Sequence, residues 1–200
     1  MVKSVAIIGG GVIGGGWAAR FLLSGWDVRV FDPGPDAARK LDEVLANARR
    51  SVPSLRDGPS PKEGQLSFHE TIEGAVKGVS WVQESVPERL GLKLDVYHQI
   101  QKANPNVVIG SSTSGFKPSE LGEAAINPAK ITVAHPFNPV YLLPLVELVP
   151  HETMPQTEIN EAKAIMDSLG MHPLQVRKEM ELWRLRFLFS PEQAFQRQAI

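Results

Sequence analysis

The stretch "VAIIGGGVIGGG" at residues 5–16 decides the fold, because it joins a short apolar run to a turn crowded with glycine. Six of the eight positions from Gly9 to Gly16 are glycine. Glycine is costly to order, so this many glycines indicate that the backbone must approach a ligand or a packed neighbour closely. The apolar run is typical of a strand buried on both faces, and helical spacing of apolar residues begins at Ile13. We therefore expect a strand–turn–helix unit here.

The glycines have the spacing of a dinucleotide-binding turn. Gly9-x-Gly11-x-x-Gly14 follows the strand and opens the helix, and Asp32 ends the next apolar strand, residues 27–31. In this pattern the first glycine allows the tight turn, the second lets the backbone meet a diphosphate, and the third lets helix and strand pack closely. The alternative is a glycine-rich turn that binds no ligand.

The same unit also indicates which dinucleotide would bind. The start of the helix would offer the N–H groups of Val12 and Ile13 to the phosphates. Asp32 would accept hydrogen bonds from both hydroxyls of the adenosine ribose and would repel a 2′-phosphate. The sequence therefore favours NAD over NADP as the cofactor.

Apolar runs and helical patterns alternate along the rest of the chain, which predicts an α/β protein with a Rossmann-type, doubly wound, mostly parallel sheet. In the expected helix 35–50 we place Ala38, Leu41, Leu45 and Ala48 on the inner face. Residues 51–64 read as a loop. The expected strands are 5–8, 27–31, 66–68, 81–85, 107–112, 131–135, 145–149 and 174–176, and the other expected helices start near Ile13, Leu90, Pro118 and Thr157.

Composition excludes several classes of function. The 200 residues carry 21 Lys and Arg against 22 Asp and Glu, a formal net charge of −1, so nothing points to nucleic acid. The chain has no cysteine, which excludes disulfides and thiolate metal sites in it and favours a cytoplasmic location. We expect no metal.

No apolar run approaches the about 18 residues that a membrane span needs, so we expect no membrane association. The N-terminus could be taken for a signal peptide, since Lys3 precedes an apolar run. Glycines interrupt that run, however, and Arg20 and Asp27 follow it, so we interpret it as a strand and turn.

A histidine and a glutamate in "AHPFNPVYLLPLVELV", residues 134–149, form the second candidate site. His135 ends a predicted strand, where open α/β sheets bind ligands, and Glu147 interrupts the next apolar strand. An isolated histidine before proline is more often structural, but a buried acid needs a partner. If the two side chains pair, Glu147 would fix the imidazole tautomer and stabilise its protonated form.

Hydroxyl side chains follow the predicted strand 107–112 in "SSTSG", residues 111–115. They could bind an alcohol or carbonyl oxygen near the nicotinamide. They could equally cap the helix expected near Pro118. The sequence leaves both alternatives open.

Together these motifs resemble the 3-hydroxyacyl-CoA dehydrogenase superfamily over residues 3–178. The resemblance rests on the glycine turn, "ESVPERLGLK" (84–93), "SSTS" (111–114) and "HPFNP" (135–139) with its downstream glutamate. It implies that His135 is the general base, that Glu147 orients it, and that Ser114 binds the reacting oxygen of the substrate.

The resemblance further implies that Glu88 and Lys93 contact the nicotinamide-ribose side of NAD, and that Asn138 positions substrate. For Glu88 and Lys93 the alternative is a solvated helix face, and for Asn138 it is a plain turn role.

Within the superfamily, residues 135–149 are most similar to the branch that oxidises carnitine, with the lambda-crystallin (gulonate dehydrogenase) branch next. The implied reaction is NAD-dependent oxidation of a small 3-hydroxy acid, carnitine to 3-dehydrocarnitine. Phe137 and Tyr141 are candidates to bind a trimethylammonium group. The alternatives are a 3-hydroxyacyl-CoA or L-gulonate dehydrogenase, and a noncatalytic NAD-binding module.

The sequence departs from the family after residue 178. We predict an NAD-binding domain over 1–178 and an atypical tail over 179–200, where members of the family continue into a helical domain that completes the substrate site and the homodimer. The resemblance therefore implies that this chain binds NAD and turns substrate over poorly by itself.

Overall fold

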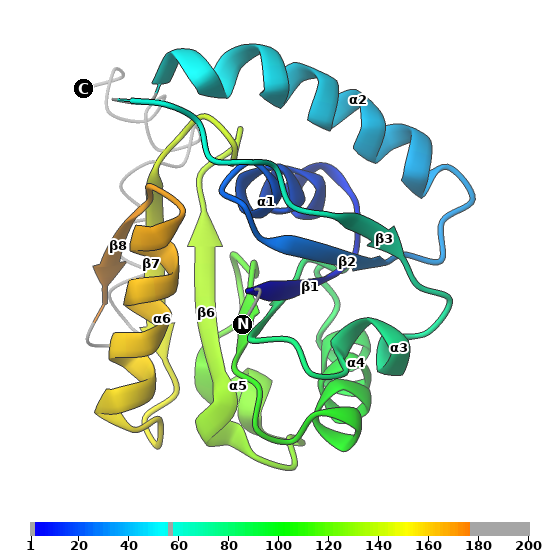
Figure 1. The fold of residues 1–200 in the computed structure, drawn as a ribbon. Helices are drawn as coiled ribbons and strands as arrows, with labels where there is room; N and C mark the ends of the chain where they lie inside the picture. The colour runs from blue at the N-terminus through cyan, green and yellow to red at the C-terminus, as the bar shows by residue number, and fades with distance from the viewer. Residues whose placement is uncertain (1–2, 56–57, 177–200) are drawn as a thin grey trace, which may run out of the picture.

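The structure is a computed structural model that describes residues 3–55 and 58–176, and a twisted eight-stranded sheet lies at its centre (Figure 1). The strand order is β3-β2-β1-β4-β5-β6-β7-β8. Neighbours are parallel from β3 to β6, β7 runs antiparallel to β6, and β8 is parallel to β7. The strands are β1 (Ser4–Ile8), β2 (Asp27–Phe31), β3 (Leu66–Phe68), β4 (Trp81–Glu84), β5 (Ile109–Ser111), β6 (Ile131–Pro136), β7 (Leu145–Pro150) and β8 (His172–Gln175).

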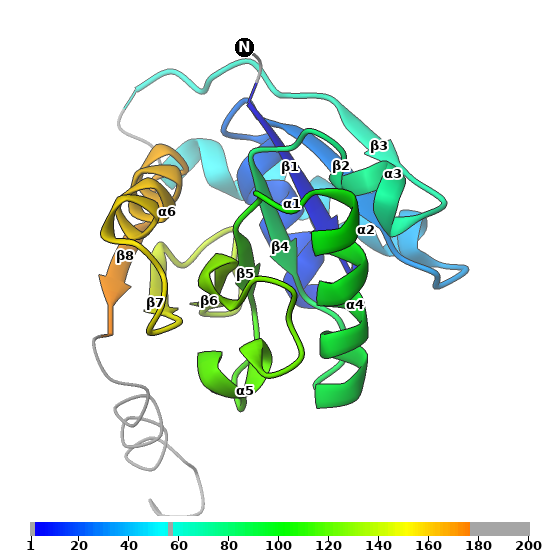
Figure 2. The ribbon, with the colours of Figure 1, turned by 90° about the horizontal axis from the view of Figure 1, so that it is seen from below.

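Helices cover both faces of this sheet, so the predicted doubly wound Rossmann-type architecture is confirmed (Figures 1 and 2). One buried cluster joins the sheet to α1, α2 and α6, and a second joins its other face to α3, α4 and α5. The helices are α1 (Val12–Leu22), α2 (Ala37–Ser51), α3 (Ile72–Val76), α4 (Leu90–Ala103), α5 (Pro118–Gly122) and α6 (Gln156–Ser168), with short 3₁₀ turns at Val52–Leu55 and Pro128–Lys130.

Most predicted elements are confirmed, with local differences. The short helix α3 was not expected, and β5 is shorter than the apolar run that predicted it. The placement of Ala38 on the inner face of α2 is wrong: Ala38 is exposed, and Ala37 is buried instead. Ala37 precedes Leu41 by four residues and Leu45 by eight, so it continues their stripe, whereas Ala38 lies about 100° further round the helix.

The glycine turn brings α1 directly against the sheet. Gly9 has a φ of +94°, a conformation that side chains other than glycine rarely adopt. A Cβ atom on Gly14 would lie 1.8 Å from the carbonyl oxygen of Gly9 and 3.2 Å from the Cβ of Ser85. Only glycine permits this contact, which fixes the start of α1 above the carboxyl ends of β1 and β4.

The tail predicted over residues 179–200 lies outside the described residues. Within residues 3–55 and 58–176, no helix is both long enough and apolar enough to cross a membrane.

Candidate cofactor and acid–base site

The start of α1 is open toward the outside of the molecule. Gly11 is the N-cap residue of α1 and has no side chain that could occupy the first N–H groups of the helix. A Cβ atom built on it would have no neighbour within 4 Å. Gly11 and Val12 are exposed. The first-turn N–H groups therefore face free space, which is the environment that a diphosphate needs at a helix N-terminus.

Asp32 lies beside this turn at the end of β2. Its Oδ2 accepts the N–H of Gly10 at 2.6 Å, and its Oδ1 accepts the N–H of Gly34 at 2.7 Å. A carboxylate has about four acceptor positions, so the two that remain can accept the two hydroxyls of a ribose. The turn and the acid together fit an adenine dinucleotide.

Replacing the second and the third glycine of the motif, Gly11 and Gly14, is expected to have different effects. Gly11→Ala should weaken NAD binding by more than about tenfold and leave thermal stability nearly unchanged, since its methyl group enters only the diphosphate space. Gly14→Ala should instead unfold the turn, because its methyl group meets the Gly9 carbonyl. Calorimetry with NAD and thermal unfolding of both variants check this. Normal NAD affinity in Gly11→Ala would place the diphosphate elsewhere.

Asp32→Asn should lower the preference for NAD over NADP by about tenfold or more, because hydrogen bonds to a charged group and the repulsion of a 2′-phosphate are both lost. The measurement is the pair of dissociation constants for NAD and NADP. Asp36→Asn, at a nearby exposed acid, is the matched control. An equal loss of affinity for both cofactors would contradict the assignment.

His135 and Glu147 meet across the antiparallel pair of β6 and β7. They are directly opposite in the strand register, so both side chains project from the same face. His135 Nδ1 lies 3.0 Å from Glu147 Oε2, with the glutamate buried and the histidine side chain 23% exposed. With Nδ1 on the carboxylate, Nε2 is the ring nitrogen left to exchange a proton with a substrate.

Of the other predicted substrate residues, Phe137 contacts the histidine ring, and the rest lie on the turn after β6 or beyond β5. Phe137 packs edge-on against His135, with 5.6 Å between ring centroids, and is partly exposed. Asn138 is exposed in the turn after β6, and Tyr141 is half-buried against the core. Ser114 is exposed beyond β5, the parallel neighbour of β6. No cluster of three or more metal-ligating His, Asp or Glu side chains occurs in the part of the chain that the structure describes.

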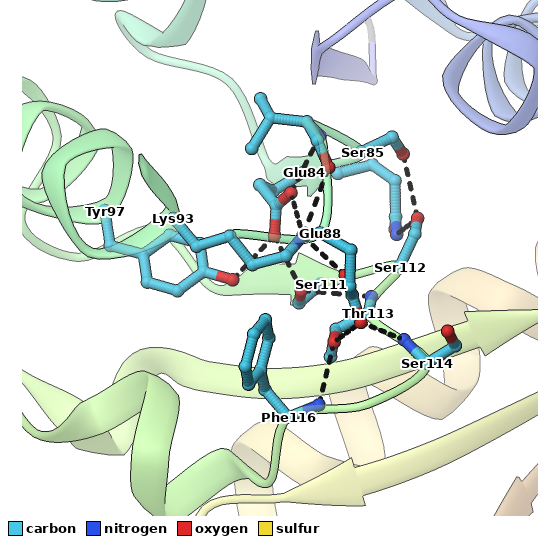
Figure 3. A network of polar contacts seen from close by, with 12 residues as sticks. Glu84, Ser85, Glu88, Lys93, Tyr97, Ser111, Ser112, Thr113, Ser114 and Phe116 are labelled. Atoms are coloured by element: carbon cyan, nitrogen blue, oxygen red, sulfur yellow. Dashed lines mark hydrogen bonds and ion pairs between the residues drawn. The ribbon is translucent and has the colours of Figure 1, made fainter. Parts of the chain in front are cut away.

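A buried carboxylate at the end of β4, that of Glu84, is the centre of a network of polar contacts (Figure 3). Glu84 is fully buried: its Oε1 accepts from Val86 N (2.8 Å) and Lys93 Nζ (2.7 Å), and its Oε2 accepts from Tyr97 Oη and Ser111 Oγ, both at 2.6 Å. Burial, followed by the charge and hydrogen bond of Glu84, raises the pKa of Tyr97 well above its ordinary value, so Tyr97 stays a donor. All four acceptor positions of Glu84 are filled.

Lys93 points into the protein, so the alternative that placed it on a solvated helix face is wrong. Its side chain is 1% exposed, and Nζ contacts Glu84 Oε1, the carbonyl oxygen of Val86 at 3.3 Å and Glu88 Oε2 at 3.4 Å. An ammonium group has three donors, and all three are directed at these atoms. The charge of Glu84 draws Lys93 inward, because a buried carboxylate requires a paired cation.

Glu88 links this ion pair to the loop that carries Ser114. Its Oε1 accepts the Thr113 hydroxyl at 2.5 Å, Ser114 N at 2.9 Å and Gly115 N at 2.8 Å. Burial raises the pKa of Glu88, but the Thr113 hydrogen bond, the charge of Lys93 and the loop N–H groups outweigh it and hold the pKa below its usual value. Glu88 therefore stays a carboxylate that shapes the Ser114 loop.

Sequence reasoning missed the roles of Glu84 and Tyr97, and it did not foresee that Ser111 and Thr113 of the hydroxyl-rich stretch pair with Glu84 and Glu88. The signal for Glu84 was present, since an acid ends the apolar strand "WVQE" just as Glu147 interrupts "LVELV". The partners come from α4 and β5, and no local spacing pairs them with β4.

This arrangement has a counterpart among known proteins. Residues 4–180 match the family described as 3-hydroxyacyl-CoA dehydrogenase, NAD binding domain. The chain belongs to this family. NAD is therefore the cofactor of this NAD-binding domain, in agreement with the preference predicted from Asp32.

Two relatives are similar to this domain over 90% of the chain. It is 65% identical over 181 residues to the L-carnitine dehydrogenase/betainyl-CoA thioesterase of Ruegeria pomeroyi, covering 37% of that protein. It is 50% identical over 184 residues to the L-carnitine dehydrogenase of Mesorhizobium japonicum, covering 50% of it. The chain thus spans half or less of the length of these relatives.

Solved structures share the fold of the domain. The NAD⁺-dependent dismutase FHMPC 5-dehydrogenase superposes with a TM-score of 0.87 at 28% identity, covering all of this chain and 67% of that one. The (S)-3-hydroxybutyryl-CoA dehydrogenase of Ralstonia eutropha superposes with a TM-score of 0.77 at 23% identity, over 88% of this chain and 64% of the other. The second comparison concerns the fold alone.

Proposed function

We propose that the chain supplies the NAD-binding and acid–base half of an enzyme that oxidises the 3-hydroxyl of L-carnitine to 3-dehydrocarnitine. The observation that carries the proposal is the His135–Glu147 contact of 3.0 Å at the carboxyl edge of a sheet that also holds the glycine turn. The 65% identity to a protein with L-carnitine dehydrogenase in its name supports carnitine as the substrate.

Bound NAD would supply the acceptor for the hydride that leaves the carbinol carbon. His135 Nε2 takes the hydroxyl proton as that hydride leaves, so that the C–O single bond becomes a carbonyl. Glu147 holds Nδ1 and stabilises the imidazolium that forms. The exposed Ser114 hydroxyl donates a hydrogen bond to the reacting oxygen, in the loop that Glu88 holds.

The contacts to NAD follow the same edge of the sheet. Gly9, Gly11 and Gly14 admit the diphosphate onto the N–H groups of Val12 and Ile13. Asp32 binds the adenosine ribose. Glu88 contacts the nicotinamide ribose directly, and Lys93 acts through Glu88, since its ammonium group is enclosed.

A trimethylammonium group would sit against an aromatic face next to the histidine. Phe137 is partly exposed and packs on the His135 ring, which places an aromatic surface at the reacting centre. Tyr141 and Asn138 are the further substrate contacts that we propose on this side.

The test is reduction of NAD by the purified chain with L-carnitine, L-gulonate and 3-hydroxybutyryl-CoA in parallel, followed by the absorbance of the reduced nicotinamide. Since the chain is expected to turn substrate over poorly by itself, the proposal predicts slow but measurable reduction, with the highest kcat/KM for carnitine. Preference for either of the other substrates would reassign the reaction. NAD binding with no reduction by any of the three would leave an NAD-binding module and overturn the proposal.

We also infer that residues 1–178 form one NAD-binding unit, which the family match over 4–180 supports. The absence of cysteine in the sequence favours the reducing cytoplasm as its location. The resemblance to homodimeric dehydrogenases makes a second copy the expected partner, which light scattering of the chain would test.

A further inference from the structure

A chain of hydrogen bonds connects β4 with the segment after β5 and with α1, and its first link has a fixed direction. The indole Nε1 of Trp81 donates to Gln83 Oε1 at 3.0 Å. An indole N–H is a donor only, so it fixes which end of the Gln83 amide is oxygen. The amide nitrogen Nε2 therefore faces Ser112 Oγ at 2.9 Å and donates to it.

Ser112 receives a second donor from α1. Trp17 Nε1 lies 3.1 Å from Ser112 Oγ and can only donate. A hydroxyl has two acceptor positions and one hydrogen, and Gln83 and Trp17 fill both acceptor positions. The single hydrogen of Ser112 must therefore go to Ser85 Oγ, which is 2.8 Å away (Figure 3).

This direction leaves the hydrogen of Ser85 unused. Ser85 Oγ accepts from Ser112, and among the described residues no acceptor for its own O–H is found. Four donors precede it in this chain of hydrogen bonds, and they polarise the Ser85 hydroxyl and strengthen it as a donor: Trp81, Gln83, Trp17 and Ser112.

Ser85 lies at the cofactor turn. It directly follows β4, and its carbonyl oxygen would be 2.7 Å from a Cβ atom on Gly9. Asp32, which would bind the adenosine ribose, ends β2, on the opposite side of β1 in the strand order. Ser85 therefore lies toward β5 and β6, which precede Ser114 and carry His135, on the side of the sheet where we propose that the nicotinamide binds.

We propose that Ser85 is a further cofactor-binding residue, which donates its hydroxyl hydrogen to an oxygen of NAD beyond the adenosine monophosphate. That oxygen belongs to the second phosphate or to the nicotinamide ribose. Trp17, Gln83 and Ser112 act as positioning residues that aim the donor outward.

The test is calorimetry of the chain and of Ser85→Ala with NAD⁺, ADP-ribose, ADP and AMP in the absence of substrate. Ser85→Ala should bind NAD⁺ and ADP-ribose about tenfold more weakly, the usual cost of one hydrogen bond to a polar or charged oxygen, and bind AMP as before. A loss with ADP assigns the phosphate, and a loss only with ADP-ribose assigns the ribose.

Unchanged AMP affinity also shows that the variant is folded. Ser67→Ala, which removes an exposed hydroxyl on β3, is the matched control and should leave all four affinities unchanged. No loss for NAD⁺, or an equal loss for AMP and ADP-ribose, would overturn the proposal. Because these titrations contain no carnitine, their outcome is independent of whether carnitine is the substrate.

Discussion

His135→Ala should lower the rate of NAD-linked carnitine oxidation by about 10²–10⁴-fold and leave NAD affinity nearly unchanged. In the proposed reaction the histidine accepts the proton through Nε2, while its Nδ1 lies 3.0 Å from Glu147 Oε2. It takes no part in the glycine turn or in the Asp32 contacts, so removing it should not disturb the cofactor site. The measurements are the initial rate of nicotinamide reduction and the NAD dissociation constant of the same preparation.

Two companion variants make this result specific. Glu147→Gln keeps the shape of the pair but removes its charge, so it should also slow the reaction while NAD still binds. His98→Ala, at an exposed histidine on α4, should leave the rate unchanged. A His135→Ala protein with its rate intact, or with NAD affinity lowered by the same factor as its rate, would remove His135 from the role of base.

Lys93→Met should destabilise the domain by about 3–5 kcal/mol, because it leaves the Glu84 carboxylate buried without a counter-ion. The two side chains are 1% and 0% exposed, so water cannot replace the lost ammonium group. Methionine has a similar length, which limits the packing change. The free energy of unfolding from urea titration, or the shift in thermal midpoint, measures the effect.

An exposed ion pair provides the control. Arg39→Met breaks the Arg39–Glu43 pair on α2, whose side chains are 60% and 64% exposed, and should cost less than about 1 kcal/mol. The double variant Lys93→Met/Glu84→Gln should recover part of the loss, because it removes the unpaired charge. A Lys93→Met variant as stable as Arg39→Met would contradict the pairing.

The doubly wound, mostly parallel sheet could be predicted because the local signals agree with one another. The glycine turn at Gly9 requires a strand before it and a helix after it, and the apolar runs that follow have the lengths of buried strands. The prediction was less reliable where one element adjusts to another. Ala37 rather than Ala38 is buried, because the packing of the whole α2 face decides the rotation of the helix.

The candidate site, too, could be predicted from the sequence only in part. Glu147 could be paired with His135 from sequence because an acid inside an apolar strand needs a partner, and a histidine stood at the end of the preceding strand. Lys93 could not be placed, because its partner Glu84 lies on a different element and a helix face is read from its apolar residues. The Ser112 hydrogen bonds join three segments, which are α1, the end of β4 and the end of β5, so only the folded chain brings them together.

The reversal of direction at β7 has a consequence for how the acid–base pair behaves during turnover. The hydrogen-bond ladder between β6 and β7 sets the distance between His135 and Glu147, which are only 12 residues apart in the chain. Because the two strands are hydrogen-bonded to each other along this ladder, any displacement of one strand moves the other with it. The contact between His135 and Glu147 is thus formed before the substrate binds, and no hinge movement is needed to make it.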